Sequence, residues 1–148
     1  MEPYEGWGRI DDGDDRETTR AAAERWIRAW KEGWEALDAS PIVAAYDEQA
    51  VHRSTSLRAP EPGGVAGYLS RCFPDESDVT SRFGVWAVSG SYALTIYNAA
   101  LDDEAEGGEV TIAGCDVLRF SDEGLCIEQR GYWNISPGRL SNHLAWPA

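Results

Sequence analysis

Two titratable side chains, Asp116 and His52, lie in segments whose patterns predict β-strands. Asp116 follows Cys115 and precedes Val117 in an alternating run, where a carboxylate is costly unless it is solvated, paired or protonated. Burial raises the pKa of such a carboxyl, so it can donate a proton near neutral pH. Imidazole titrates in the same range. The two residues therefore predict acid/base chemistry, with His52 as base and Asp116 as acid or as the group that orients His52.

Strand alternation predicts which other side chains share the face of these two groups. The expected pocket wall combines aromatic, aliphatic and hydrogen-bonding residues: Trp30, Trp34, Tyr46, Ser54, Tyr68, Tyr97, Leu118, Gln129 and Trp133. On the third strand the facing could be shifted by one residue, which leaves Asn98 as the alternative to Tyr97. Each candidate also has a structural interpretation. A strand histidine is commonly a hydrogen-bonded core residue, and a sheet aspartate commonly holds a neighbouring amide.

The elements that position these residues are three helical patterns followed by strands. A long helix is predicted over residues 16–37, because apolar residues recur there at helical spacing. Four of these residues on one face are tryptophan or alanine. The next expected elements are a short helix that ends at Asp47-Glu48-Gln49, a strand over 50–56, a helix over 65–73, and strands over 79–88, 92–101, 109–120 and 125–134. This order predicts an α+β fold, with three N-terminal helices packed on one face of a curved, mainly antiparallel sheet.

The length of 148 residues indicates one domain, which we expect over residues 18–135. The flanking segments are predicted to be an acidic flexible tail over residues 1–17 and an irregular tail over 136–148. No apolar run approaches the length of a membrane span, and the N-terminus lacks the apolar region of a signal peptide. The sequence therefore favours a protein that neither crosses nor is exported across a membrane.

Composition narrows the classes of partner. A net charge of −13 argues against nucleic acid and anionic membranes, since both bind basic surfaces. Three cysteines at positions 72, 115 and 126 fit neither a disulfide framework nor a zinc site, which predicts reduced thiols in the cytoplasm. The acidic stretch over residues 102–109 lacks the spacing of a calcium loop. We expect no metal and no cofactor.

Several segments resemble a known superfamily: Gly33–Leu37, Ala44–Val51, Tyr68–Phe73, and Asp116–Gly124 followed by Tyr132–Asn134. On these residues the chain resembles the nuclear transport factor 2-like superfamily, and within it the SnoaL-like polyketide cyclases and the ketosteroid isomerases. The resemblance covers residues 20–134. It implies a cone in which a strongly bent sheet wraps the long helix around a deep apolar pocket. It also implies a homodimer formed through the outer face of the sheet.

The resemblance to ketosteroid isomerases implies site residues only where positions match. Those enzymes use a tyrosine on the first helix, an aspartate base at the end of the first strand and a protonated aspartate in the sheet. Asp116 matches the sheet aspartate. Trp30 stands at the tyrosine position and Ser54 at the base position, and neither side chain can replace the group it stands for. Ketosteroid isomerase activity is therefore not expected.

Three functional hypotheses remain open from the sequence. The first is a cofactor-independent acid/base enzyme, of cyclase, isomerase or hydrolase type, that acts on an apolar small molecule. The second is a non-catalytic protein that binds an apolar ligand in the same pocket. The third is a dimerising interaction module of the same fold. A fold alone does not choose among them, because one fold serves many activities.

Overall fold

The computed structural model describes residues 16–55 and 57–140. The elements in chain order are α1 (Arg16–Ala36), α2 (Ala39–Val43), β1 (Tyr46–Arg53), α3 (Gly64–Cys72), η1 (Phe73–Asp75), β2 (Glu76–Ser89), β3 (Tyr92–Asp103), η2 (Glu104–Glu106), β4 (Gly108–Phe120) and β5 (Cys126–Pro137). The expected α+β order of helices followed by long strands is confirmed. Residues 1–15 and 141–148 of the two expected tails lie outside the described residues. Arg16 and Glu17 already belong to α1, and β5 continues three residues beyond its expected end.

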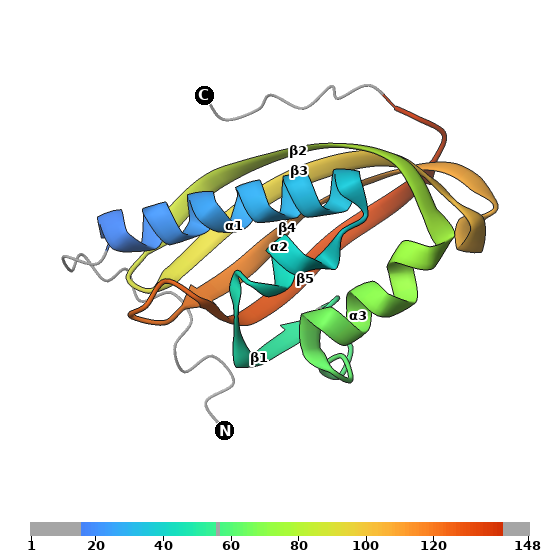
Figure 1. Cartoon of the computed structure of the whole chain (residues 1–148). Coiled ribbons are helices and arrows are strands. Elements are labelled where there is room, and N and C mark those ends of the chain that lie inside the picture. The colour runs from blue at the N-terminus through green and yellow to red at the C-terminus, as the bar shows by residue number, and fades with distance from the viewer. Residues whose placement is uncertain (1–15, 56, 141–148) are drawn as a thin grey trace.

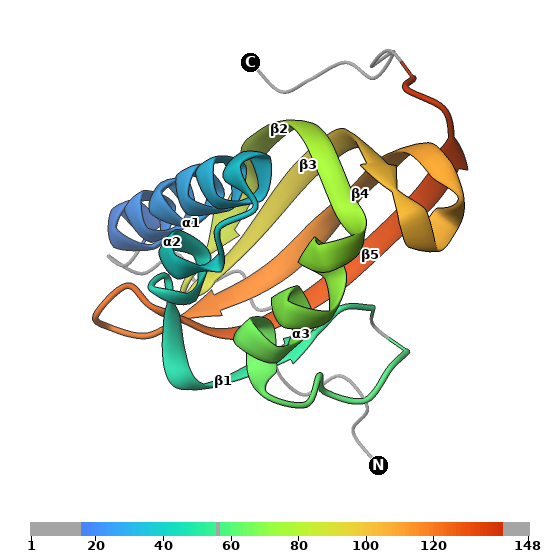
Figure 2. The ribbon, with the colours of Figure 1, turned by 45° about the vertical axis from the view of Figure 1, so that its right-hand side comes forward.

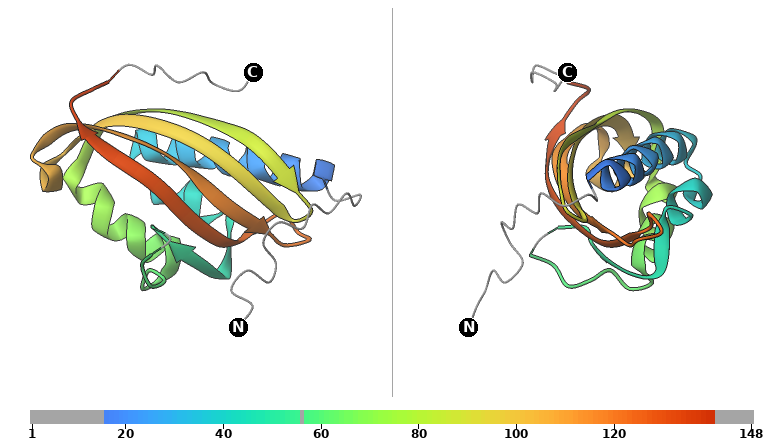
Figure 3. Two further views of the ribbon diagram at one scale, coloured as in Figure 1. Left: turned by 180° about the vertical axis from the view of Figure 1, so that it is seen from behind. Right: turned by 90° about the vertical axis from the view of Figure 1, so that its left-hand side faces the viewer.

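The five strands form one sheet in the order β1-β5-β4-β3-β2. The pairs β2–β3, β3–β4 and β4–β5 are antiparallel, whereas β1 pairs with β5 in parallel. The sheet bends strongly around α1 without closing into a barrel, and α3 lies beneath its wide end (Figures 2 and 3). The expected curved, mainly antiparallel sheet with helices inside its concave face is confirmed.

Helix α1 packs a stripe of tryptophans into the concave face. Trp26, Trp30 and Trp34 recur every four residues and are at most 7% exposed. Their rings contact one another, with centroids 5.7 Å apart for the first pair and 6.0 Å for the second. Large buried aromatic surfaces of this kind dominate the stability of a core. Gly33 lets α2 approach, since a Cβ there would lie only 2.6 Å from Ile42.

The second helix is shorter than the sequence predicts. Residues 47–49 were expected to end a helix, but α2 stops at Val43 and β1 begins at Tyr46. The reason is tertiary: Ala45 accepts a hydrogen bond from the Cys126 amide at 2.9 Å, and Tyr46 is paired with Cys126 in the parallel register. Pairing with β5 thus overrides the helical propensity of an acidic segment. The strand that carries His52 therefore spans Tyr46–Arg53 instead of the expected 50–56, and it begins earlier and ends before Ser54.

Two further expectations concern surfaces. None of the helices in the described part of the chain combines the length and hydropathy needed to cross a membrane. The homodimer through the outer face of the sheet stays a prediction. Trp86 on β2 and Tyr92 on β3 are 53% and 37% exposed in the monomer.

Candidate active site

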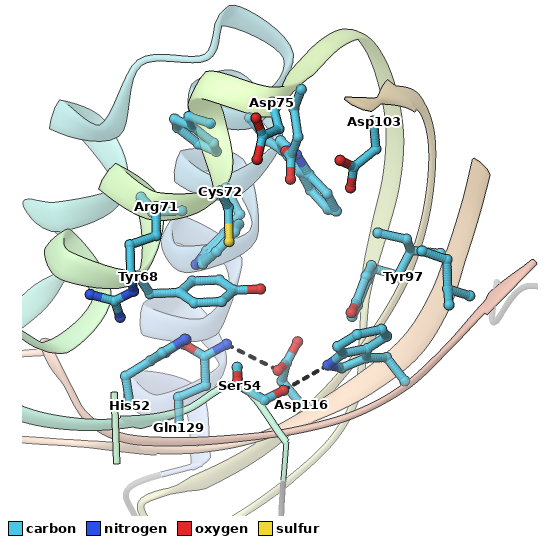
Figure 4. Close-up of a pocket in the computed structure, with 18 of the residues that line it drawn as sticks. His52, Ser54, Tyr68, Arg71, Cys72, Asp75, Tyr97, Asp103, Asp116 and Gln129 are labelled. Carbon is cyan, nitrogen blue, oxygen red and sulfur yellow. Dashed lines mark hydrogen bonds between the residues drawn. The ribbon is translucent and has the colours of Figure 1, made fainter. Parts of the chain in front are cut away.

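A cavity of about 320 Å³ lies between the concave face of the sheet, α1 and α3. Of the sequence-predicted residues, nine line it: Trp30, Trp34, His52, Ser54, Tyr68, Tyr97, Asp116, Gln129 and Trp133. Figure 4 shows the Tyr68 hydroxyl and the Asp116 carboxyl both turned toward the interior. The volume and the largely apolar wall are those of a small-molecule pocket.

Two predicted pocket residues, Tyr46 and Leu118, lie outside the cavity lining. Leu118 is fully buried toward the end of β4, where the following turn packs on α1: a Cβ on Gly124 would lie 3.7 Å from Ala22. Tyr46 is buried behind Gln129, to which its hydroxyl donates a hydrogen bond. Strand alternation placed Leu118 on the inward face, and Tyr46 was expected to reach the pocket from a helix; the structure buries both without bringing either to the cavity wall.

Asp116 is the deepest carboxyl of the pocket and is only 5% exposed. Gln129 Nε2 donates to its Oδ1 at 3.0 Å, and no other described side chain or backbone group donates to it. Burial raises its pKa to about 7, against the opposing effect of the Gln129 hydrogen bond. Gly131 is opposite Asp116 on β5 and leaves space, because a Cβ there would meet both the Ser54 carbonyl and the carboxyl itself. A carboxyl with this pKa exists in both protonation states near neutral pH.

The side chain of Gln129 connects Asp116 with His52. The hydrogen-bonding properties of its neighbours determine which end of the Gln129 amide faces each residue. The Trp30 indole N–H can only donate, so Tyr46 accepts from it at 3.0 Å and donates onward to Gln129 Oε1. Burial raises the pKa of Tyr46 far above its ordinary value, which keeps the hydroxyl neutral. Gln129 therefore presents its oxygen toward Tyr46 and His52, and its amide nitrogen toward Asp116.

This orientation assigns the tautomer of His52. Nδ1 lies 2.9 Å from Gln129 Oε1, an acceptor, so Nδ1 carries the proton and Nε2 keeps a lone pair. Nε2 is buried and has no partner within the described residues. Burial lowers the pKa of His52, despite the Gln129 hydrogen bond, and this favours the neutral ring. The imidazole lies 4.9 Å from the Tyr68 ring, centroid to centroid. His52 and Asp116 thus share Gln129 instead of contacting each other, so Asp116 does not orient His52 directly.

The rim near β1 is held by a polar group that the sequence did not reveal. Ser54 Oγ donates to Glu61 at 2.7 Å, and Arg71 donates to the other Glu61 oxygen at 2.7 Å. Burial raises the pKa of Glu61, but these two donors outweigh it and lower the pKa below its usual value. Trp133 Nε1 donates to the Ser54 carbonyl at 2.7 Å (Figure 4). Arg71 follows Tyr68 by three residues on α3, a helical spacing that could have indicated a shared face.

A second pocket carboxyl, Glu76, was also missed. Trp34 Nε1 donates to its Oε1 at 2.6 Å. Burial raises its pKa to about 7, Trp34 lowers it, and the charges of Asp103 and Asp75 raise it further. Alternation from buried Val79 and Ser81 would place Glu76 outside, but β2 has a register shift between Ser77 and Thr80. No sequence signal for that irregularity was visible in the strand pattern.

Comparison with known proteins gives the family. A sequence model of the SnoaL-like domain matches residues 23–129. The chain belongs to the SnoaL-like domain family. No curated protein matches the sequence.

Solved structures share the fold of this SnoaL-like domain. SalBIII, described as an epoxide hydrolase/cyclase-like enzyme in pyran ring formation of salinomycin, is 20% identical with a TM-score of 0.65, over 82% of this chain and 96% of that one. A Mycobacterium tuberculosis epoxide hydrolase of the LEH-like type is 19% identical with a TM-score of 0.56, over 81% and 85%. A computationally designed 17-OHP binder is 16% identical with a TM-score of 0.60, over 78% and 97%. At these identities the similarity establishes the fold alone.

The SnoaL-like pocket offers proton donors, proton acceptors and apolar walls. In the described part of the chain, no group of three or more His, Cys, Asp or Glu residues is arranged to hold a metal ion. The buried Asp116 carboxyl can donate or accept a proton near neutral pH, and the His52 Nε2 lone pair can accept one. Proton transfer to or from a ligand in the cavity is the chemistry these groups can perform.

Proposed function

We propose that this SnoaL-like protein is a cofactor-independent acid/base enzyme that acts on an apolar small molecule. The observation that carries the proposal is Asp116, a buried carboxyl with a pKa of about 7 that lines an apolar cavity and has one hydrogen-bond donor. A structural aspartate is usually paired by several donors or a cation, which lower its pKa. In the proposed mechanism Asp116 donates a proton to a substrate oxygen, and His52 Nε2 accepts one from a substrate carbon or from water.

The residues around this pair support the proposed roles. Gln129 contacts both groups through one amide, which fixes the position of each relative to the other. The aromatic side chains of Trp30, Trp133 and Tyr97 exclude water and bury the apolar body of the substrate. Removal of water strengthens each hydrogen bond made to a developing charge.

Deuterium exchange tests the chemistry without knowledge of the natural substrate. Apolar enolisable ketones and apolar epoxides are incubated with the protein in D2O, and label uptake or ring opening is followed by mass spectrometry. We expect Asp116→Asn to lower the rate by about 100-fold or more, the usual contribution of a general acid or base. The matched control is Asp122→Asn, the same change in the exposed turn between β4 and β5. Equal rates for Asp116→Asn and wild type would remove Asp116 from the mechanism.

The second candidate is a binding protein without catalysis. It is favoured by the designed 17-OHP binder, which shares the fold and is described as a binder. It is also favoured by the lack of direct contact between His52 and Asp116. This candidate predicts saturable binding of apolar ligands and a rise in melting temperature with ligand concentration. Saturable binding with no exchange or ring opening in wild type would support it over the enzyme.

A further inference from the structure

Figure 4 shows Asp75 and Asp103 at the opposite end of the pocket from His52 and Gln129, and Glu76 adjoins both. It begins β2 and is paired with Asp103 of β3. Trp34 holds one of its oxygens at 2.6 Å, and Oε2 has no hydrogen-bond partner within residues 16–55 and 57–140. Both Glu76 and Asp103 line the cavity, as does Asp75. A half-buried carboxyl is thus fixed in the wall with one oxygen available to a ligand.

Acidic side chains on the adjoining stretches of β2, β3 and β4 share one arginine, whereas those in the pocket have no basic partner among the described residues. Arg139 lies 3.1 Å from Asp78, 3.7 Å from Asp102 and 3.4 Å from Glu109. For Asp75, Glu76 and Asp103 the described residues include no ion-pair partner, although Asp103 accepts a hydrogen bond from the Ala105 amide. The pocket end therefore has a negative charge that no side chain of the described chain balances.

The arginines that line the cavity do not supply that balance. Arg71 is held by Glu61 at 2.7 Å and by the Pro62 carbonyl at 3.2 Å. Figure 4 shows Arg71 on the α3 side of the pocket, away from Asp103. Arg58 is exposed on the loop after β1. Among the described residues, neither of these arginines forms an ion pair with a carboxyl at the Glu76 end.

Aromatic rings surround the same end. Phe83 and Tyr97 stack with centroids 5.4 Å apart, and Trp34 lies 6.4 Å from the first and 6.1 Å from the second. The faces of such rings attract cations, most strongly when water is excluded. An independent polar feature of the cavity is His52, which is 2% exposed and has an unpartnered Nε2. The Glu76 end of the pocket therefore combines a carboxyl oxygen with an aromatic wall.

We propose that the Glu76 end of the pocket binds an organic ammonium group, so that the ligand is an apolar molecule with a protonated amine. The ammonium would donate to Glu76 Oε2 and lie against the Trp34, Phe83 and Tyr97 rings. This inference names the substrate class for the proposed function and uses the same cavity. It depends on binding alone, so it can hold whether or not the bound molecule is converted.

Isothermal titration with three matched probes tests the proposal. Phenylbutylamine, phenylbutanol and phenylbutyrate share an apolar body and differ in charge at one end. The titrations are run at about pH 8, above the pKa of about 7 of Glu76. We expect wild type to bind the amine about tenfold more tightly than the alcohol and the carboxylate most weakly, which is the effect of one charge-assisted hydrogen bond. Glu76→Gln should remove the advantage of the amine and leave alcohol affinity unchanged.

Glu104→Gln is the matched control, because Glu104 is an exposed residue of η2 outside the cavity lining. The substitution changes net charge equally without altering the pocket, so amine affinity should stay at the wild-type value. Gln at position 76 can still accept from Trp34, and circular dichroism confirms that the variant is folded. Equal affinity for amine and alcohol in wild type, an equal loss in both variants, or no binding of any probe would overturn the proposal. Loss of turnover in Asp116→Asn has no bearing on these results.

Discussion

Replacement of Tyr46 by phenylalanine removes one oxygen from the centre of the polar network and keeps the ring. Trp30 Nε1 loses its acceptor, and Gln129 Oε1 loses one of two donors. A buried donor without a partner costs about 1–3 kcal/mol. We therefore expect Tyr46→Phe to lower the free energy of unfolding by about 2 kcal/mol in urea denaturation.

The same substitution should weaken the preference of His52 for a single tautomer. In wild type, a proton on Nε2 would leave the Nδ1 lone pair facing Gln129 Oε1 at 2.9 Å. The lost buried hydrogen bond costs about 2 kcal/mol, which gives the Nδ1–H form a preference of about 30-fold. In Tyr46→Phe only Asp116 orients the amide, and a protonated carboxyl can donate to the amide oxygen instead. Since the pKa of Asp116 is about 7, the variant should show one tautomer well above pH 7 and a mixture below it.

Nitrogen NMR reads this directly, because protonated and unprotonated ring nitrogens differ widely in chemical shift. The sequence contains two histidines, so a His143→Gln background leaves the signals of His52 alone. Tyr68→Phe is the matched control, since Tyr68 contacts the imidazole ring but does not bond to Gln129. Wild-type protein in the Nε2–H form would refute the donor assignment. A single tautomer at every pH in Tyr46→Phe would show that another contact sets it.

Two further predictions concern stability. Because burial raises the native pKa values of Asp116 and Glu76 to about 7, the native state binds more protons than the unfolded chain between about pH 4 and 7, so stability should fall as pH rises through that window. Asp116→Asn should remove the contribution of Asp116 to this pH dependence, up to about 4 kcal/mol, and flatten the profile of unfolding free energy against pH. An unchanged slope of that profile would contradict the pKa assigned to Asp116. Gly131→Ala should cost about 1–3 kcal/mol in denaturant titration, because its Cβ would meet the Ser54 carbonyl. Wild-type stability in that variant would mean that β1 and β5 can separate at no cost.

The sequence determined the fold class and most of the inward face of the pocket. Tryptophans at helical spacing predicted α1, and alternation along β4 and β5 placed Asp116, Gln129 and Trp133 on one side. These are local properties: a period of 3.6 or 2 records which face each element buries. A carboxylate within such a face was recognisable as unusual before any neighbour was known.

Tertiary structure alone decided how these residues are connected. Parallel pairing with β5 turned Tyr46 from a helical residue into a strand residue behind Gln129, and the packing of α1 excluded Leu118 from the cavity. The irregularity in β2 turned Glu76 inward, and the donor-only indole of Trp30 set the direction of every hydrogen bond as far as His52. Such relations join residues up to 83 positions apart. A repeating pattern along one segment contains no information about which distant partner completes a hydrogen bond or where a cavity closes.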